Sequence, residues 1–169
     1  MKLAALAAAA LLTPTIAAAP PRGPEIVAVA VGHDRATGFV AGDDRVITVA
    51  HVLGGDITVD GRAATIVRVD RGRDLAVLRV PGIRGPRARF GGGGETSLLG
   101  RPATVVRHID ASVDGGPRRR ALEIRADVEI GDSGAPLVTP TGRVAGVVFA
   151  RSRARPGVAY ATALDHSSP

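Results

Sequence analysis

The sequence predicts an all-β protein made of two antiparallel barrels, and three observations lead to this fold class. Short apolar runs recur along the chain with turn-forming residues between them, and the 169 residues include 22 Gly and 12 Pro. Such spacing favours many short strands over helices. Aromatic residues make up only 2% of the chain, so the core must be built from Val, Ala, Leu and Ile. The four consecutive glycines at 91–94 predict a crossover between two barrels.

Six of the apolar runs precede these glycines. Their length and their content of Val, Ile and Thr are typical of strands. Gly42-Asp43-Asp44 and Asp60-Gly61 have the composition of hairpin turns. We expect a short helical turn at Ala50–Leu53 and strands at Glu25–Gly32, Thr37–Ala41, Arg45–Ala50, Asp56–Val59, Arg62–Asp70 and Leu75–Val80.

Five more runs follow the glycines and have the same character. So many short strands within about 140 residues predict closed or nearly closed barrels. The five expected strands are Ala103–His108, Ala121–Val128, Ala135–Val138, Arg143–Ala150 and Val158–Ala161.

The first 19 residues have the features of a secretory signal peptide. Lys2 precedes an apolar stretch, and three alanines at 17–19 supply the small residues of a cleavage site. Pro14 interrupts the stretch and argues against a stable membrane span, with an uncleaved anchor as the alternative. We expect a secreted or periplasmic protein with a signal peptide at 1–19, a linker at 20–24, one domain at 25–162 and a tail at 163–169.

The chain is basic, with a net charge of +6. Basic proteins are attracted to anionic partners, and cell-envelope polymers are a candidate. Nucleic acid is not expected, because no aromatic residues interleave with the arginines and no nucleic-acid motif is present. The run Arg118-Arg119-Arg120 follows Gly116-Pro117, which predicts a solvated loop. The chain has no cysteine, which excludes thiol catalysis and cysteine metal sites, and we expect neither a metal nor a cofactor.

Residues 131–134, Gly-Asp-Ser-Gly, carry the strongest chemical signal. Glycines on both sides of Ser133 allow a tight turn that exposes the hydroxyl as a nucleophile. The same turn aims the N–H groups of Gly131 and Ser133 at one point, as an oxyanion hole requires. The tetrapeptide alone also occurs in polar surface turns, but here apolar strand patterns lie on both sides. Asp132 is expected to shape the loop by accepting hydrogen bonds.

A serine nucleophile needs a base, and the base needs a group that orients it. His51 ends a buried-looking strand and is the candidate base, whereas His33, His108 and His166 are expected to be exposed. A histidine in such a place is otherwise most often structural.

Asp74 is the candidate orienting acid, because it directly precedes the apolar run that starts at Leu75. A carboxylate there could accept the histidine Nδ1–H and stabilise the imidazolium. Asp70 is the competing candidate, but Arg71-Gly72-Arg73 beside it indicates a turn.

These residues resemble the trypsin-like, chymotrypsin-fold serine proteases, and within that family the periplasmic proteases of mycobacteria. The resemblance covers residues 25–162 and implies two six-stranded-type antiparallel barrels with the active site between them. It also implies a secreted serine endopeptidase that cleaves peptide or protein substrates through an acyl-enzyme. The segments that carry it are Thr37–Val40, Ala50–Val52, Asp74–Leu78, Ile124–Glu129, Gly131–Gly134 and Gly142–Phe149.

The resemblance also implies substrate-binding residues. An aspartate at the place of Asp127 lies at the floor of the specificity pocket in some relatives and pairs with Arg or Lys of the substrate. Other loop lengths would place it elsewhere. Phe149 and Arg151 fall on the strand that would bind the substrate backbone. Ala135 stands where the family usually has glycine, and together with the basic surface it supports an alternative, a catalytically inactive binding module of the cell envelope.

Overall fold

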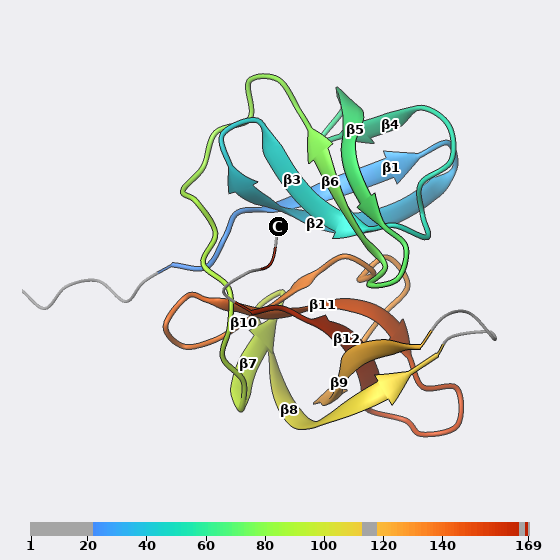
Figure 1. The fold of residues 1–169 in the computed structure, drawn as a ribbon, viewed down its shortest axis with the longest axis vertical. Coiled ribbons are helices and arrows are strands. Elements are labelled where there is room, and N and C mark those ends of the chain that lie inside the picture. The colour runs from blue at the N-terminus through green and yellow to red at the C-terminus, as the bar shows by residue number, and fades with distance from the viewer. Residues whose placement is uncertain (1–21, 113–117, 166–167, 169) are drawn as a thin grey trace, which may run out of the picture.

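Two closed antiparallel barrels make up the protein. The computed structural model describes residues 22–112, 118–165 and 168, and within these ranges all regular structure is β. The strand order is β1-β2-β3-β6-β5-β4 in the first barrel and β10-β11-β12-β9-β8-β7 in the second. The two lie side by side, and the segment from 80 to 94 passes along one edge of the molecule between them (Figure 1). The predicted two-barrel architecture is confirmed.

The first barrel matches the expected strands closely. Val27, Val29 and Val31 alternate inward on β1, which is the period of a strand with one buried face. The expected helical turn at Ala50–Leu53 is a single hydrogen-bonded turn and not a helix. The strands are β1 (Ile26–Val31), β2 (Asp34–Gly42), β3 (Arg45–Val49), β4 (Ile57–Val59), β5 (Arg62–Asp70) and β6 (Leu75–Arg79).

The second barrel contains one strand that the sequence did not predict. Its residues are mostly polar, and it forms by pairing with both β8 and β10. The β8 and β12 strands are also longer than expected, and β9 begins two residues earlier. The strands are β7 (Glu95–Leu98), β8 (Arg101–Ala111), β9 (Arg119–Ala126), β10 (Pro136–Val138), β11 (Val144–Arg151) and β12 (Val158–Ala163).

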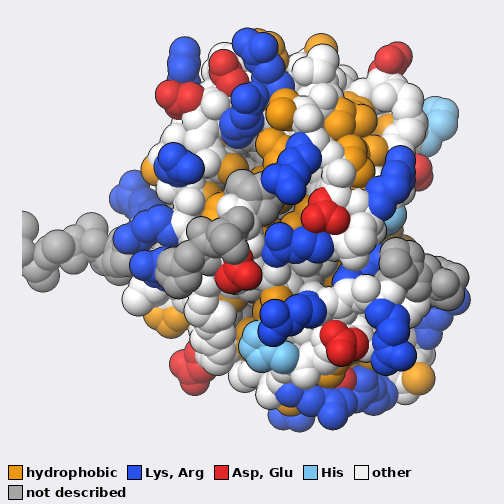
Figure 2. Space-filling view, viewed as in Figure 1, with side chains coloured by type: hydrophobic (Ala, Val, Ile, Leu, Met, Phe, Trp, Pro, Cys, Tyr) orange, Lys and Arg blue, Asp and Glu red, His pale blue; other side chains and the backbone are white. Residues whose placement is uncertain are grey.

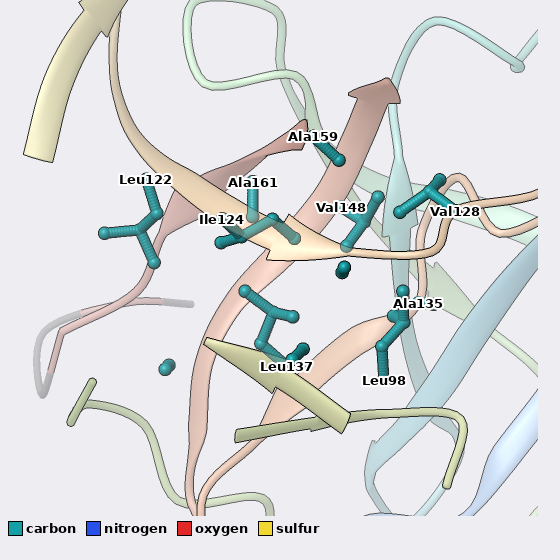
Figure 3. Packing of buried hydrophobic residues seen from close by; sticks show 12 residues of the cluster. Leu98, Leu122, Ile124, Val128, Ala135, Leu137, Val148, Ala159 and Ala161 are labelled. Atoms are coloured by element: carbon teal, nitrogen blue, oxygen red, sulfur yellow. The ribbon is translucent and has the colours of Figure 1, made fainter. Parts of the chain in front are cut away.

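Aliphatic side chains fill the second barrel, as the composition predicted. Figure 3 shows Leu137, Ile124 and Val148 directed toward one another from three different strands. Ala135 lies in the same cluster and is fully buried. Small and large side chains from facing strands therefore pack together without any aromatic ring in this cluster.

A second apolar cluster joins the two barrels. Phe39, Ile47 and Leu75 of the first barrel pack in it with Val147 and Phe149 of the second. Leu164, directly after the end of β12, is also buried in this cluster. The barrels are thus fixed to each other along the seam where the candidate site lies.

The predicted signal peptide at 1–19 lies outside the described residues. Within the described part of the chain, no helix is long and apolar enough to cross a membrane. Arginine side chains are spread over the face seen in Figure 2, with acidic side chains between them.

Candidate active site

His51 and Asp74 are hydrogen-bonded at the seam between the barrels. The imidazole Nδ1 lies 2.7 Å from Asp74 Oδ2, and the His51 backbone N–H donates to Asp74 Oδ1 at 2.9 Å. The His51 side chain is 46% exposed and the Asp74 side chain 8%. The carboxylate therefore fixes both the backbone and the ring of a histidine that solvent and substrate can reach. His33 and His108 are exposed, as expected.

The turn before β6 holds Asp74 in an uncommon backbone conformation. Its φ is +56°, a left-handed value that non-glycine residues seldom adopt. Thr162 Oγ1 donates to the Arg73 carbonyl at 2.7 Å, and Arg73 Nη2 donates to the Ala163 carbonyl at 3.0 Å. The second barrel thus secures the turn that presents the acid. Asp70 accepts the Arg73 N–H and closes this turn, which is the role its neighbours indicated.

The loop 131–134 has the tight conformation expected from its glycines. Gly131 and Gly134 have φ values of +98° and +92°. A Cβ on Gly134 would lie 1.9 Å from the Thr37 carbonyl oxygen and 2.7 Å from Thr48 Oγ1. Only glycine fits there without a shift of the backbone, so the loop can rest directly on the first barrel.

Thr37 on β2 anchors this loop through two hydrogen bonds. Its N–H donates to the Ser133 carbonyl and its Oγ1 donates to the Gly131 carbonyl, each at 2.8 Å. The Thr37 carbonyl in turn accepts the hydroxyl of the fully buried Thr48 at 2.8 Å. No role was predicted for these threonines, although a threonine within an apolar strand run is a usable signal.

Asp132 organises the loop from the other side, as predicted. It accepts the Glu129 N–H at 2.8 Å and a hydrogen bond from the Arg101 guanidinium. The hydrogen bond from Arg101 to Asp132 raises the pKa of Arg101, with smaller contributions from the charges of Glu129 and Asp127. Arg101 therefore stays charged and ties the loop to the start of β8.

His51 and Ser133 line one hollow of about 400 Å³. No described residue forms a hydrogen bond with Ser133 Oγ, and none accepts from the N–H of Ser133 or Gly131. The hydroxyl and the two backbone donors are therefore free for a ligand. In sites of this kind the hydrogen bond between histidine and serine is often long in the absence of substrate and shortens when substrate binds. The lining residues are Asp34, Arg35, His51, Val52, Val128, Glu129, Ile130, Gly131, Ser133, Ala150 and Arg151.

The three predicted substrate-binding residues lie in different surroundings. Arg151 lines the hollow and is exposed. Phe149 is buried in the cluster between the barrels and does not line the hollow, whereas Ala150 and Arg151 do. The pairing of β11 with β12 shifts register between Val148 and Ala150, so simple alternation does not hold there. Asp127 is exposed, lies outside the lining and faces the charge of Arg101. The neighbouring Val128 lines the hollow in its place.

The arginine run at 118–120 does not behave as one solvated loop. Arg119 begins β9, and its side chain is only 8% exposed. Its Nη1 lies 3.2 Å from Asp74 Oδ2, and its guanidinium carbon lies 5.0 Å from the centre of the Phe149 ring. The prediction is wrong for this residue, whereas Arg118 and Arg120 are exposed.

Ala135 causes no strain at its position. It is fully buried in the core of the second barrel, and its φ is not in the left-handed region. Its N–H donates to the Asp132 carbonyl at 2.9 Å. Its methyl group therefore adds to the core and leaves the loop conformation intact. Among the described residues, no three His, Asp or Glu side chains lie close enough together to hold a metal ion.

Comparison with known proteins agrees with this geometry. Residues 36–147 match the family model of the trypsin-like peptidase domain. The serine protease Rv3671c of Mycobacterium tuberculosis is 37% identical over 139 residues, which cover 67% of this chain and 35% of the relative. The chain thus spans about a third of that relative's length.

Solved structures show the same similarity. The crystal structure of the active form of the Rv3671c protease superposes with a TM-score of 0.74 at 30% identity, covering 94% of this chain and 89% of that one. A serine endoprotease from Yersinia pestis gives a TM-score of 0.65 at 22% identity over 84% and 59% of the two chains. At that identity the second match shows the fold alone.

Proposed function

Because the chain belongs to the trypsin-like peptidase family, we propose that it is a secreted serine endopeptidase that works through an acyl-enzyme. The observation that carries the proposal is the 2.7 Å contact between His51 and Asp74, beside a hollow that His51 shares with Ser133. These are the three groups that acyl transfer to a serine requires.

In the proposed reaction, Ser133 Oγ attacks the carbonyl carbon of the scissile peptide. Its proton passes to His51 Nε2, which then gives the proton to the leaving amine. Water repeats the sequence on the resulting ester, releases the acid and restores Ser133. Asp74 keeps the proton of the resting imidazole on Nδ1, so that Nε2 is free to accept, and stabilises the imidazolium that forms.

The Gly131 and Ser133 N–H groups are the proposed oxyanion donors. Both lack a partner among the described residues, so they have no bond to give up when charge develops on the carbonyl oxygen. One such donor contributes about 3–4 kcal/mol to the barrier reduction. The bonds from Thr37 to the carbonyls of Gly131 and Ser133 hold the peptide units of this loop in place.

A groove for an extended peptide leads away from Ser133. A second hollow of about 800 Å³ shares Ala150 and Arg151 with the first and continues to Ser112 and Tyr160. A peptide lying along it would run beside the end of β11 and could pair with that strand's backbone. Such pairing binds the substrate main chain whatever its sequence.

The hollow beside Ser133 favours an apolar side chain at the substrate residue whose carbonyl is attacked. Val128 and Ala150 line it, and its two acidic residues, Asp34 and Glu129, are matched by the two basic residues Arg35 and Arg151. A hollow without net charge gives little preference for Arg or Lys, and Asp127 lies outside it.

Labelling with a fluorophosphonate tests the proposed activity directly. The reagent phosphonylates a serine only where a neighbouring base activates it. The mature chain should be labelled at Ser133, Ser133→Ala should abolish labelling, and a peptide library should be cut after small apolar residues. A folded chain that is neither labelled nor able to cut any peptide would refute the proposal and favour the inactive binding module.

The proposed export has its own test. The features of residues 1–19 support secretion through a signal peptide. Expression in a bacterium with an outer membrane should yield a periplasmic product that lacks these residues, as mass determination of the mature chain would establish. A cytoplasmic product with an intact N-terminus would contradict it.

A further inference from the structure

We propose that Arg119 is a positioning residue for the proposed catalytic triad, a role that deepens the function proposed above. Arg119 lies in the second barrel and Asp74 in the first, so their 3.2 Å ion pair crosses the seam of the molecule. Both side chains are 8% exposed. Asp74 Oδ2 thereby accepts from His51 Nδ1 on one side and contacts a fixed cation on the other.

The charge of Asp74 explains why a cation is needed there. A buried carboxylate is costly unless it is paired and hydrogen-bonded. Resting His51 is neutral when it acts as a base, so it offers a hydrogen bond but no countercharge. Arg119 is the cation that the described residues place on Asp74 Oδ2. It therefore supplies the countercharge that the buried carboxylate requires.

The contact with Phe149 fixes the orientation of the guanidinium. Its central carbon lies 5.0 Å from the centre of the Phe149 ring, a distance typical of a cation–π contact. Phe149 is held in the cluster between the barrels and stacks on Tyr160, with the two ring centroids 6.5 Å apart. A guanidinium placed against a fixed ring has few alternative positions, so Nη1 defines where Asp74 Oδ2 lies.

An unpaired donor argues against a purely stabilising role. Arg119 Nε is buried with no hydrogen-bond partner among the described residues. Burying an N–H without a partner destabilises the folded state. Arg118 and Arg120 on either side are exposed, whereas the Arg119 side chain is only 8% exposed. Its inward position is explained by what it does for Asp74.

The test compares Arg119→Met, Arg119→Lys and Arg119→Ala in the full chain. Arg120→Met is the matched control, because Arg120 is the exposed next residue on the same strand. Outer-shell groups that orient metal ligands are worth about 10–100-fold in affinity or activity, and we take the same range for a group that orients the Asp74 carboxylate. We expect Arg119→Met to lower kcat and the fluorophosphonate labelling rate by about that factor with KM little changed, because substrate binding does not involve this residue.

Three further measurements separate positioning from general stability. Added guanidinium should restore part of the activity of Arg119→Ala and none in Arg120→Met. Arg119→Lys should recover less activity than retention of the positive charge alone would predict, because an ammonium lacks the planar contact with Phe149. The His51 Nδ1 proton resonance, read by NMR with ¹⁵N-labelled histidine, should be strongly downfield in the parent and in Arg120→Met and shifted in Arg119→Met.

The outcomes are distinguishable from failure of the proposed function. If Arg119→Met is labelled at the parent rate with an unchanged Nδ1 resonance, the positioning role is wrong. If the parent chain is never labelled, the peptidase proposal fails. The Nδ1 resonance still decides whether Arg119 orients the His51–Asp74 pair in that case.

Discussion

Gly134→Ala should damage both the stability and the reactivity of the protein. The added Cβ would lie 1.9 Å from the Thr37 carbonyl oxygen, where ordinary contacts begin at about 3.4 Å. Neither atom can move alone, because the oxygen belongs to the backbone of β2 and accepts the Thr48 hydroxyl. The loop must therefore move away from the first barrel.

The magnitude follows from the contacts that are lost. A non-glycine residue at a φ of +92° costs about 1–3 kcal/mol. Moving the loop also breaks the bonds from Thr37 to Ser133 and Gly131, each worth about 0.5–1.5 kcal/mol. We expect a loss of about 2–6 kcal/mol in the free energy of unfolding. Because the loop has then moved away from Thr37, labelling of Ser133 should also be abolished.

Chemical denaturation followed by far-UV circular dichroism measures the free energy of unfolding, since the chain has no tryptophan to report by fluorescence. Fluorophosphonate labelling measures the reactivity of Ser133. Gly157→Ala is the control, because Gly157 has a φ of +72° but nothing within 4 Å of the added Cβ. A Gly134→Ala variant as stable as this control and labelled at the parent rate would refute the reasoning.

Three other expectations follow from contacts elsewhere in the structure. Thr37→Val removes the hydroxyl that donates to Gly131 and should slow labelling about 2- to 10-fold, whereas Thr37→Ser should not. Leu137→Ala empties a fully buried position in the second barrel and should cost about 2–5 kcal/mol in denaturation, and a loss below 1 kcal/mol would contradict the packing seen in Figure 3. Hydrogen bonds from Arg155 and Arg107 lower the pKa of Glu123 to about 2, so its contribution to stability is present above about pH 4.3, its unfolded value, and is lost as the pH falls toward 2. The unfolding midpoint of Glu123→Gln should therefore fall less between pH 5 and pH 2 than that of the parent, and equal falls would show that this carboxylate contributes nothing.

Local pattern was enough to single out His51, Asp74 and Ser133 as candidates. Each lies next to a strand or turn whose composition is distinctive over a few residues, so long-range contacts were not needed to find it. The strand β7 (Glu95–Leu98) was missed because Glu95, Thr96 and Ser97 have no apolar alternation. It exists because β8 and β10 offer their edges on both sides, which is information that a single segment does not contain.

Contacts across the seam were not predictable in the same way. Thr37 and Gly131 are separated by 94 residues, and nothing near either residue indicates that they meet. The surroundings of two predicted substrate-binding residues have a related cause. Asp127 and Phe149 do not line the hollow, whereas their neighbours Val128 and Ala150 do. Asp127 lies after the end of β9, and the pairing of β11 with β12 shifts register between Val148 and Ala150, so neither orientation follows from strand alternation.

Arg119 shows how the two-barrel arrangement changes the meaning of a sequence pattern. Along β9, Leu122 and Ile124 point into the second barrel, and Ala121 lies on the opposite face, buried against the first barrel. Arg119 is two residues before Ala121 and shares its face. In a barrel standing alone that face would be solvated, and three consecutive arginines would all be surface residues. Docking of the first barrel buries the middle one beside Asp74, so its charge becomes part of the site only through the packing of the two halves.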